Sequence, residues 1–116
     1  MNGLISYRLE ISLAAPVRVK VGKLGEFDFP AGRYLYTGSA KRNLEARIAR
    51  HLHHDKRLHW HIDYLLMPPG VAVTGVERFA QTECAVNCLA DGRVLVPGFG
   101  ASDCRAGCVS HLKFVG

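Results

Sequence analysis

The sequence predicts a single α/β domain of the α+β kind, in which a small, mainly antiparallel sheet is flanked by helices. The first third of the chain alternates apolar and polar residues between glycine and proline turns, which is typical of short antiparallel strands. The middle of the chain repeats apolar residues every four positions, which is typical of one face of a helix. The length of 116 residues is enough for one core but not for two, so we expect one domain over residues 1–116.

Six strands are expected, and the first four of them should share one small sheet. Residues 17–21 alternate valine with arginine and lysine, and the segment from Gly22 to Gly25 predicts a hairpin turn. Tyr34 and Tyr36 alternate in the fourth strand, which Gly38 is expected to end in a turn. The expected strands are residues 3–12, 17–21, 26–29, 33–36, 71–79 and 109–115.

Three helices are expected, at residues 43–53, 59–66 and 82–90. The first has Ser39 or Asn43 as its N-cap and the third has Thr82, because these side chains can accept hydrogen bonds from free backbone N–H groups. Residues 60–64 alternate as a strand would, but the proline-proline-glycine run at 68–70 favours a short helix. We expect no membrane span, because no apolar run is long enough to cross a bilayer.

The net charge of +5 is concentrated in one part of the chain. Residues 41–57 hold six lysines and arginines against two acids, and five of the six histidines lie in or beside this segment. Phosphate contacts dominate the affinity of proteins for nucleic acids, so the cluster favours DNA or another polyanion as the partner. The alternative is a solvated helix face. The candidate nucleic-acid contacts are Lys41, Arg42, Arg50, His54, Lys56, His59 and His61.

The expected helix at residues 43–53 carries an apolar stripe and a cationic stripe on different sides. The apolar stripe is Leu44, Ile48 and Leu52, and the cationic stripe is Arg47, Arg50, His51 and His54. A row of donors, a tyrosine at a strand end and backbone N–H groups at a glycine turn can each bind a phosphate oxygen. The strand, turn and helix together therefore predict a phosphate-binding unit.

Two further groups of residues allow more than one interpretation. Residues 59–63 form either a base or metal site in which Asp63 orients an imidazole, or a structural bracket. The four cysteines are Cys84, Cys88, Cys104 and Cys108. Since the N-terminus shows no export signal, we expect a cytoplasmic protein with reduced thiols. The spacing of the cysteines with His111 also allows zinc, but it lacks the C-x2-C pattern typical of zinc sites.

A motif runs from the fourth strand into the basic helix. Tyr36 and Gly38 form a Tyr-x-Gly at the strand end, Arg47 follows nine residues after the glycine, and His51 comes one turn later. In type and spacing these residues resemble the GIY-YIG nuclease superfamily. The likeness continues through residues 59–66, 83–89 and 99–114 and covers nearly the whole chain. It is similar there to a small branch that also occurs fused to endonuclease III-type glycosylases.

The resemblance implies a GIY-YIG-like metal-dependent endonuclease that hydrolyses DNA phosphodiester bonds, in DNA repair or in the processing of branched DNA. The catalytic residues it implies are Tyr7, Tyr36, Arg47 and His51. Glu83 would hold one divalent metal ion, Mg²⁺ or Mn²⁺, per site. Ile5 and Ser6 stand where the family has glycine and isoleucine before the first tyrosine, which favours the alternative of a nucleic-acid-binding module without turnover. A third reading is a small interaction domain whose cysteines bind zinc.

Overall fold

The structure is a computed structural model that describes residues 4–40, 43–52, 61–89, 92–100 and 110–116. Over these residues the expected α+β fold is confirmed. The strands are β1 (Ser6–Leu13), β2 (Val17–Val21), β3 (Gly25–Phe29), β4 (Gly32–Ser39), β5 (Val71–Phe79) and β6 (Leu112–Phe114). The helices are α1 (Leu44–Leu52), α2 (His61–Leu66) and α3 (Glu83–Leu89). In this described part of the chain, no helix is long and apolar enough to cross a membrane.

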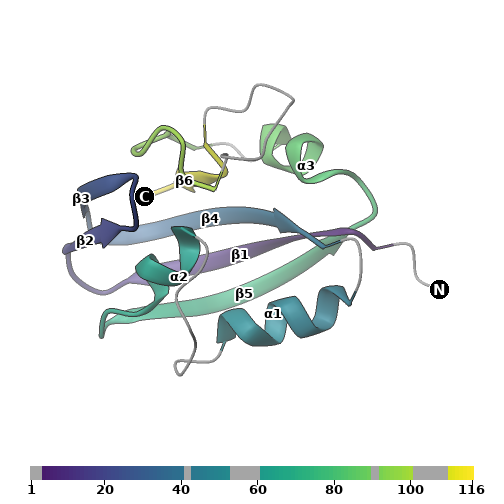
Figure 1. Cartoon of the computed structure of the whole chain (residues 1–116), viewed down its shortest axis with the longest axis horizontal. Helices are drawn as coiled ribbons and strands as arrows, with labels where there is room; N and C mark the ends of the chain where they lie inside the picture. The colour runs from purple at the N-terminus through teal and green to yellow at the C-terminus, as the bar shows by residue number, and fades with distance from the viewer. Residues whose placement is uncertain (1–3, 41–42, 53–60, 90–91, 101–109) are drawn as a thin grey trace.

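The main sheet has four strands in the order β5-β1-β4-β6, and all its pairs are antiparallel (Figure 1). Strands β2 and β3 form a separate two-stranded sheet, so the expectation that the first four strands share one sheet is wrong. The reason is burial. The hairpin turns Val19, Val21 and Phe29 into the core, where the ring of Phe29 meets Tyr34, and so it packs on the main sheet without extending it.

The pairing register places the large side chains of β1 and β4 on one face of the main sheet. Leu9 lies opposite Tyr36 and Ile11 lies opposite Tyr34, and all four are buried. Buried apolar residues of α1 and α2 belong to the same hydrophobic cluster. The core therefore lies between this face of the sheet, the two helices and the β2–β3 hairpin.

Helix α3 covers the opposite face. Neighbouring side chains of a strand point to opposite faces of a sheet. In β6 the ring of Phe114 contacts Tyr34 at a centroid distance of 4.9 Å, whereas Lys113 donates to the carbonyl of Asn87 in α3 at 2.7 Å. Figure 1 accordingly shows α1 and α3 on opposite sides of the sheet. Both helices nevertheless reach the same end of the central strands, where β1 begins and β4 ends.

Asn43 and Thr82 are confirmed as N-caps, whereas the alternative cap Ser39 is the last residue of β4. The Oδ1 atom of Asn43 accepts a hydrogen bond from the N–H of Ala46 at 3.2 Å, and Oγ1 of Thr82 accepts one from Ala85 at 3.3 Å. Each bond satisfies a backbone donor that the helix itself leaves free. The short helix expected before the proline run is also confirmed from His61 onward.

The apolar stripe expected on α1 is correct in its first two turns only. Leu44 and Ile48 are buried, whereas Leu52 is 51 % exposed. His51 takes the buried place in the last turn, at 3 % exposure, because its ring lies against Tyr7 on β1. A polar side chain thus replaces leucine where the helix meets the strand end.

Candidate active site

The candidate site begins where Tyr7 of β1 lies opposite Gly38 of β4. A Cβ atom at Gly38 would lie 2.5 Å from Oη and 2.6 Å from Cζ of Tyr7, so only glycine leaves room for the ring. The turn expected at Gly38 is wrong, because β4 continues to Ser39 and the glycine serves close packing. The neighbouring N–H of Thr37 donates to the carbonyl of His111 at 3.0 Å and is thus bonded within the protein.

Tyr7 and His51 form a buried hydrogen-bonded pair between β1 and α1. The Tyr7 Oη lies 2.5 Å from Nε2 of His51, and the two residues are 2 % and 3 % exposed. Burial raises the pKa of Tyr7 well above its ordinary value of 10.0, Tyr36 raises it further, and the charge of Arg47 partly opposes both. The hydroxyl therefore keeps its proton at neutral pH, and it shares a hydrogen bond with Nε2 of the imidazole.

Tyr36 completes the aromatic cluster from β4. Its ring stands edge-on to that of His51 at a centroid distance of 6.2 Å. Burial raises the pKa of Tyr36, the charge of Glu83 raises it further, and Arg47 opposes the rise. The charges of Arg47 and Glu83 also act on the pKa of Tyr7. The structure therefore brings the arginine and the glutamate close to both tyrosines.

Arg47 and Glu83 meet at Ser39, the last residue of β4. Nη1 of Arg47 donates to the backbone carbonyl of Ser39 at 2.8 Å, and the side chain of Ser39 is one of the groups that lower the pKa of Glu83. Burial alone would raise the pKa of Glu83, but the His111 imidazole, the Ser39 hydroxyl and the Arg47 charge outweigh it and lower the pKa. Glu83 is therefore ionised at neutral pH, with its side chain 33 % exposed.

The donor chemistry of Glu83 fits one hard divalent cation. An ionised, partly exposed carboxylate is the kind of ligand that Mg²⁺ and Mn²⁺ prefer. Within the described ranges, no group of three or more His, Cys, Asp and Glu residues could hold a metal ion. Mg²⁺ usually keeps several waters and binds through one or two carboxylates together with substrate phosphates. A single carboxylate is thus compatible with an ion shared with a phosphate.

The residues of the cationic stripe expected on α1 lie in different environments. His51 is buried, and Arg50 forms a bidentate ion pair with Asp63 of α2, with N–O distances of 2.9 and 3.0 Å. Asp63 is fully buried, and a buried charge needs a partner of this kind. Asp63 therefore joins α2 to α1, which agrees with the structural bracket, one of the two interpretations of residues 59–63. The guanidinium of Arg50 has a partner within the protein in the place of the expected phosphate.

His61 also contacts the protein itself. Its Nδ1 accepts a hydrogen bond from the N–H of Gly100 at 2.9 Å, and its ring lies 5.7 Å from that of Phe99. For the described part of residues 59–63, these contacts favour the structural bracket over a base or metal site. The remaining predicted residues lie outside the described part of the chain. They are Lys41, Arg42, His54, Lys56, His59, Cys104 and Cys108, together with the side chain of Cys88.

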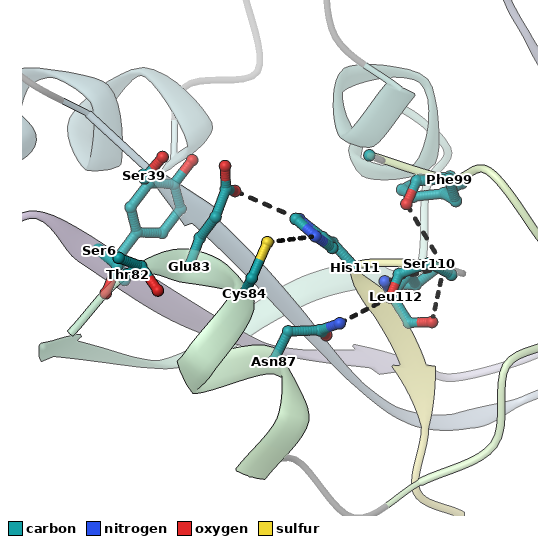
Figure 2. A network of polar contacts seen from close by, with 12 residues as sticks. Ser6, Ser39, Thr82, Glu83, Cys84, Asn87, Phe99, Ser110, His111 and Leu112 are labelled. Carbon is teal, nitrogen blue, oxygen red and sulfur yellow. Dashed lines mark hydrogen bonds and ion pairs between the residues drawn. The ribbon is translucent and has the colours of Figure 1, made fainter. Parts of the chain in front are cut away.

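One residue of the site has no predicted role in DNA cleavage. His111 is 1 % exposed, and its ring faces two neighbouring residues of α3 (Figure 2). Its Nδ1 is 3.2 Å from Oε2 of Glu83 and its Nε2 is 3.9 Å from Sγ of Cys84. The sequence signal at His111 was its place at the end of the cysteine pattern, which allowed zinc but lacked the C-x2-C spacing typical of zinc sites. His111 and Cys84 are 27 positions apart in the sequence, so no helix or strand period predicts their contact.

The comparisons with known proteins bear on the family of the chain. A family model described as "Domain of unknown function DUF123" matches residues 6–116. No curated protein matches the chain, and no solved structure does. The matched range starts at the first residue of β1 and includes the five residues of the candidate site, Tyr7, Tyr36, Arg47, His51 and Glu83.

Proposed function

The chain belongs to the DUF123 family, and we propose that it is a metal-dependent endonuclease that hydrolyses DNA phosphodiester bonds in the cytoplasm. The proposed setting is DNA repair or the processing of branched DNA. The observation that supports the proposal is the convergence of two tyrosines, a histidine, an arginine and a glutamate at one end of β1 and β4. They come from four elements: Tyr7 from β1, Tyr36 from β4, Arg47 and His51 from α1, and Glu83 from α3.

The charges of the site suit phosphodiester hydrolysis. The reaction builds negative charge on the phosphoryl oxygens, and catalysis needs positive groups placed there in advance. Arg47 bonds to the backbone carbonyl of Ser39, and its charge acts on the carboxylate of Glu83. A divalent ion bound at Glu83 would supply a Lewis acid for a phosphoryl oxygen. In the proposed complex, Arg47 binds the same phosphate group and stabilises its developing charge.

The Tyr7–His51 pair supports the removal of a proton from the attacking water. Tyr7 alone is a poor base, because burial raises its pKa and the hydroxyl keeps its proton at neutral pH. It can accept a proton from water while it passes its own to Nε2 of His51, 2.5 Å away. A relay of this kind moves one proton without forming a free phenolate, which burial disfavours.

The test is a cleavage screen with Mg²⁺ or Mn²⁺ on linear, nicked, branched and abasic DNA. The parent protein should cleave at least one of these substrates. Glu83→Gln should abolish cleavage and leave DNA binding intact, because the amide keeps the size of the side chain and removes its charge. Glu77→Gln is the matched control, since Glu77 is an exposed glutamate on β5 that pairs with Arg8. The control should cleave as fast as the parent.

Two outcomes would contradict the proposal. Cleavage by Glu83→Gln at the parent rate would remove Glu83 from the reaction. DNA binding without cleavage of any substrate would support the second candidate, a nucleic-acid-binding module without turnover, which the residues Ile5 and Ser6 before Tyr7 favour. In either case, neutralising Arg42 and Lys56 together should weaken binding and flatten its salt dependence, because phosphate contacts release counterions.

A further inference from the structure

His111 connects the strand that carries Tyr36 to the helix that carries Glu83. Its backbone is held on both sides: its N–H donates to the carbonyl of Phe99 at 2.9 Å, and its own carbonyl accepts from the N–H of Thr37 at 3.0 Å. Thr37 follows Tyr36 directly in β4. The backbone of His111 is therefore bonded directly to the residue that follows Tyr36.

The segment around His111 is fastened to α3 as well. Ser110 precedes it, and the Ser110 carbonyl accepts a hydrogen bond from Nδ2 of Asn87 in α3 at 2.8 Å (Figure 2). The Ser110 hydroxyl accepts from the N–H of Leu112 at 3.1 Å, which closes a tight turn around His111. The segment that leads into β6 is thus held by hydrogen bonds that do not involve the side chain of His111.

The ring of His111 then contacts α3 through both of its nitrogens. Nδ1 lies 3.2 Å from Oε2 of Glu83, and Nε2 lies 3.9 Å from Sγ of Cys84. At 1 % exposure the ring is enclosed by protein and has little freedom to turn away from these two side chains. One oxygen of the Glu83 carboxylate is therefore held by a ring whose own position depends on β4.

We propose that His111 is a positioning residue that holds Glu83 in the orientation in which it binds a divalent cation. This inference rests on the proposed function, which makes Glu83 the ligand of that cation. A carboxylate has two oxygens with about four acceptor sites, so one contact to Nδ1 leaves capacity for an ion. A glutamate held in one rotamer loses less conformational freedom when the ion binds. Partners of this kind are typically worth about 10- to 100-fold in metal affinity.

The two nitrogens of His111 can be separated by substitution. In His111→Asn the amide nitrogen falls near the position of Nδ1 and can still donate to Glu83. In His111→Gln the amide falls near the position of Nε2, on the side of Cys84. Cys84→Ala is the matched control, because it removes the other contact of the ring and leaves the contact with Glu83. A purely structural role would make all three variants differ from the parent in stability alone.

The experiment measures the binding of Mn²⁺ alone to the full chain, by the loss of the free-ion electron paramagnetic resonance signal. His111→Gln should weaken Mn²⁺ binding by about 10- to 100-fold, while His111→Asn and Cys84→Ala stay within about threefold of the parent. In cleavage assays, His111→Gln should raise the Mn²⁺ concentration at half-maximal rate and leave the rate at saturating Mn²⁺ close to that of the parent. Thermal melts of all variants verify that each one is folded.

The failures of the two proposals are distinguishable. Parent-like Mn²⁺ affinity in His111→Gln, or equal weakening in His111→Asn and His111→Gln, would overturn the positioning role and leave the nuclease proposal in place. A parent protein that binds no Mn²⁺, or a Glu83→Gln variant that binds it as the parent does, would overturn both.

Discussion

His51 and His111 are two buried histidines that each contact a residue of the candidate site from a different face of the sheet. His51 lies on α1, and its Nε2 is 2.5 Å from the hydroxyl of Tyr7. His111 lies just before β6, and its Nδ1 is 3.2 Å from the carboxylate of Glu83. One histidine therefore contacts a group proposed to move a proton, and the other contacts a group proposed to bind a cation.

The two histidines are held in place by different kinds of contact. His51 follows Arg47 by one helical turn, so its place beside the arginine follows from local structure. His111 is placed by backbone hydrogen bonds to Thr37 and Phe99, which belong to other parts of the chain. The difference teaches that the helix period sets the spacing of Arg47 and His51, whereas the contacts of both histidines depend on packing between distant elements.

The largest effect is expected on the His51 side. His51→Gln should lower the cleavage rate by about 100- to 10 000-fold, the usual contribution of a general acid–base group. The metal concentration at half-maximal rate should stay as in the parent, because Glu83 keeps its own contacts with Ser39 and His111. The measurement is a metal titration of the cleavage rate. A shift of that titration like the one expected for His111→Gln would show that both histidines act on the same step.

The next largest effect is a loss of stability, expected when the ion pair that joins α1 to α2 is broken. Arg50→Ala removes the bidentate partner of the fully buried Asp63 and should lower the free energy of unfolding by about 3 kcal/mol. Arg18→Ala is the control, since Arg18 pairs with Glu26 on the exposed β2–β3 hairpin and should cause no measurable change. Urea unfolding measures both variants. Equal losses in the two would mean that the buried pair is worth no more than the exposed one.

A smaller loss is expected where β1 and β4 pack most closely. Gly38→Ala should lower the free energy of unfolding by about 1 to 3 kcal/mol, because the added methyl group overlaps the ring of Tyr7. It should also slow cleavage, since the hydroxyl must move relative to His51. Gly75→Ala is the control, as its Cβ atom would meet only the side chain of Glu10, at 3.5 Å. Activity of Gly38→Ala at the parent level would separate the Tyr7 position from catalysis.

The smallest effect concerns pH. Tyr7 and Tyr36 have raised pKa values in the folded chain, mainly through burial, while an unfolded tyrosine ionises near 10.0. Their contribution to stability is therefore complete below pH 10 and is lost as the pH rises further. At half a pH unit above 10.0, each tyrosine should lower the free energy of unfolding by about 0.8 kcal/mol. Urea unfolding between pH 9 and 11 should show a steeper decline for the parent than for a Tyr7→Phe, Tyr36→Phe double variant. Parallel curves would contradict the raised pKa values.

The sequence by itself determined the secondary structure and the part of the site that local structure places. The strand at 71–79 and the caps Asn43 and Thr82 agree with the structure, because side-chain alternation and the first backbone donors of a helix are local properties. The spacing of Arg47 and His51 on one helix is local in the same sense.

The tertiary structure alone decided what those elements contact. The β2–β3 hairpin forms a separate sheet because burial of its apolar side chains favoured packing on the core. Arg50 paired with Asp63 because a buried carboxylate requires a countercharge, which no periodicity encodes. His111 reached Glu83 because strand pairing brings β6 beside β4. Each of these contacts joins segments far apart in the chain, and desolvation and packing select such contacts only when the whole core assembles.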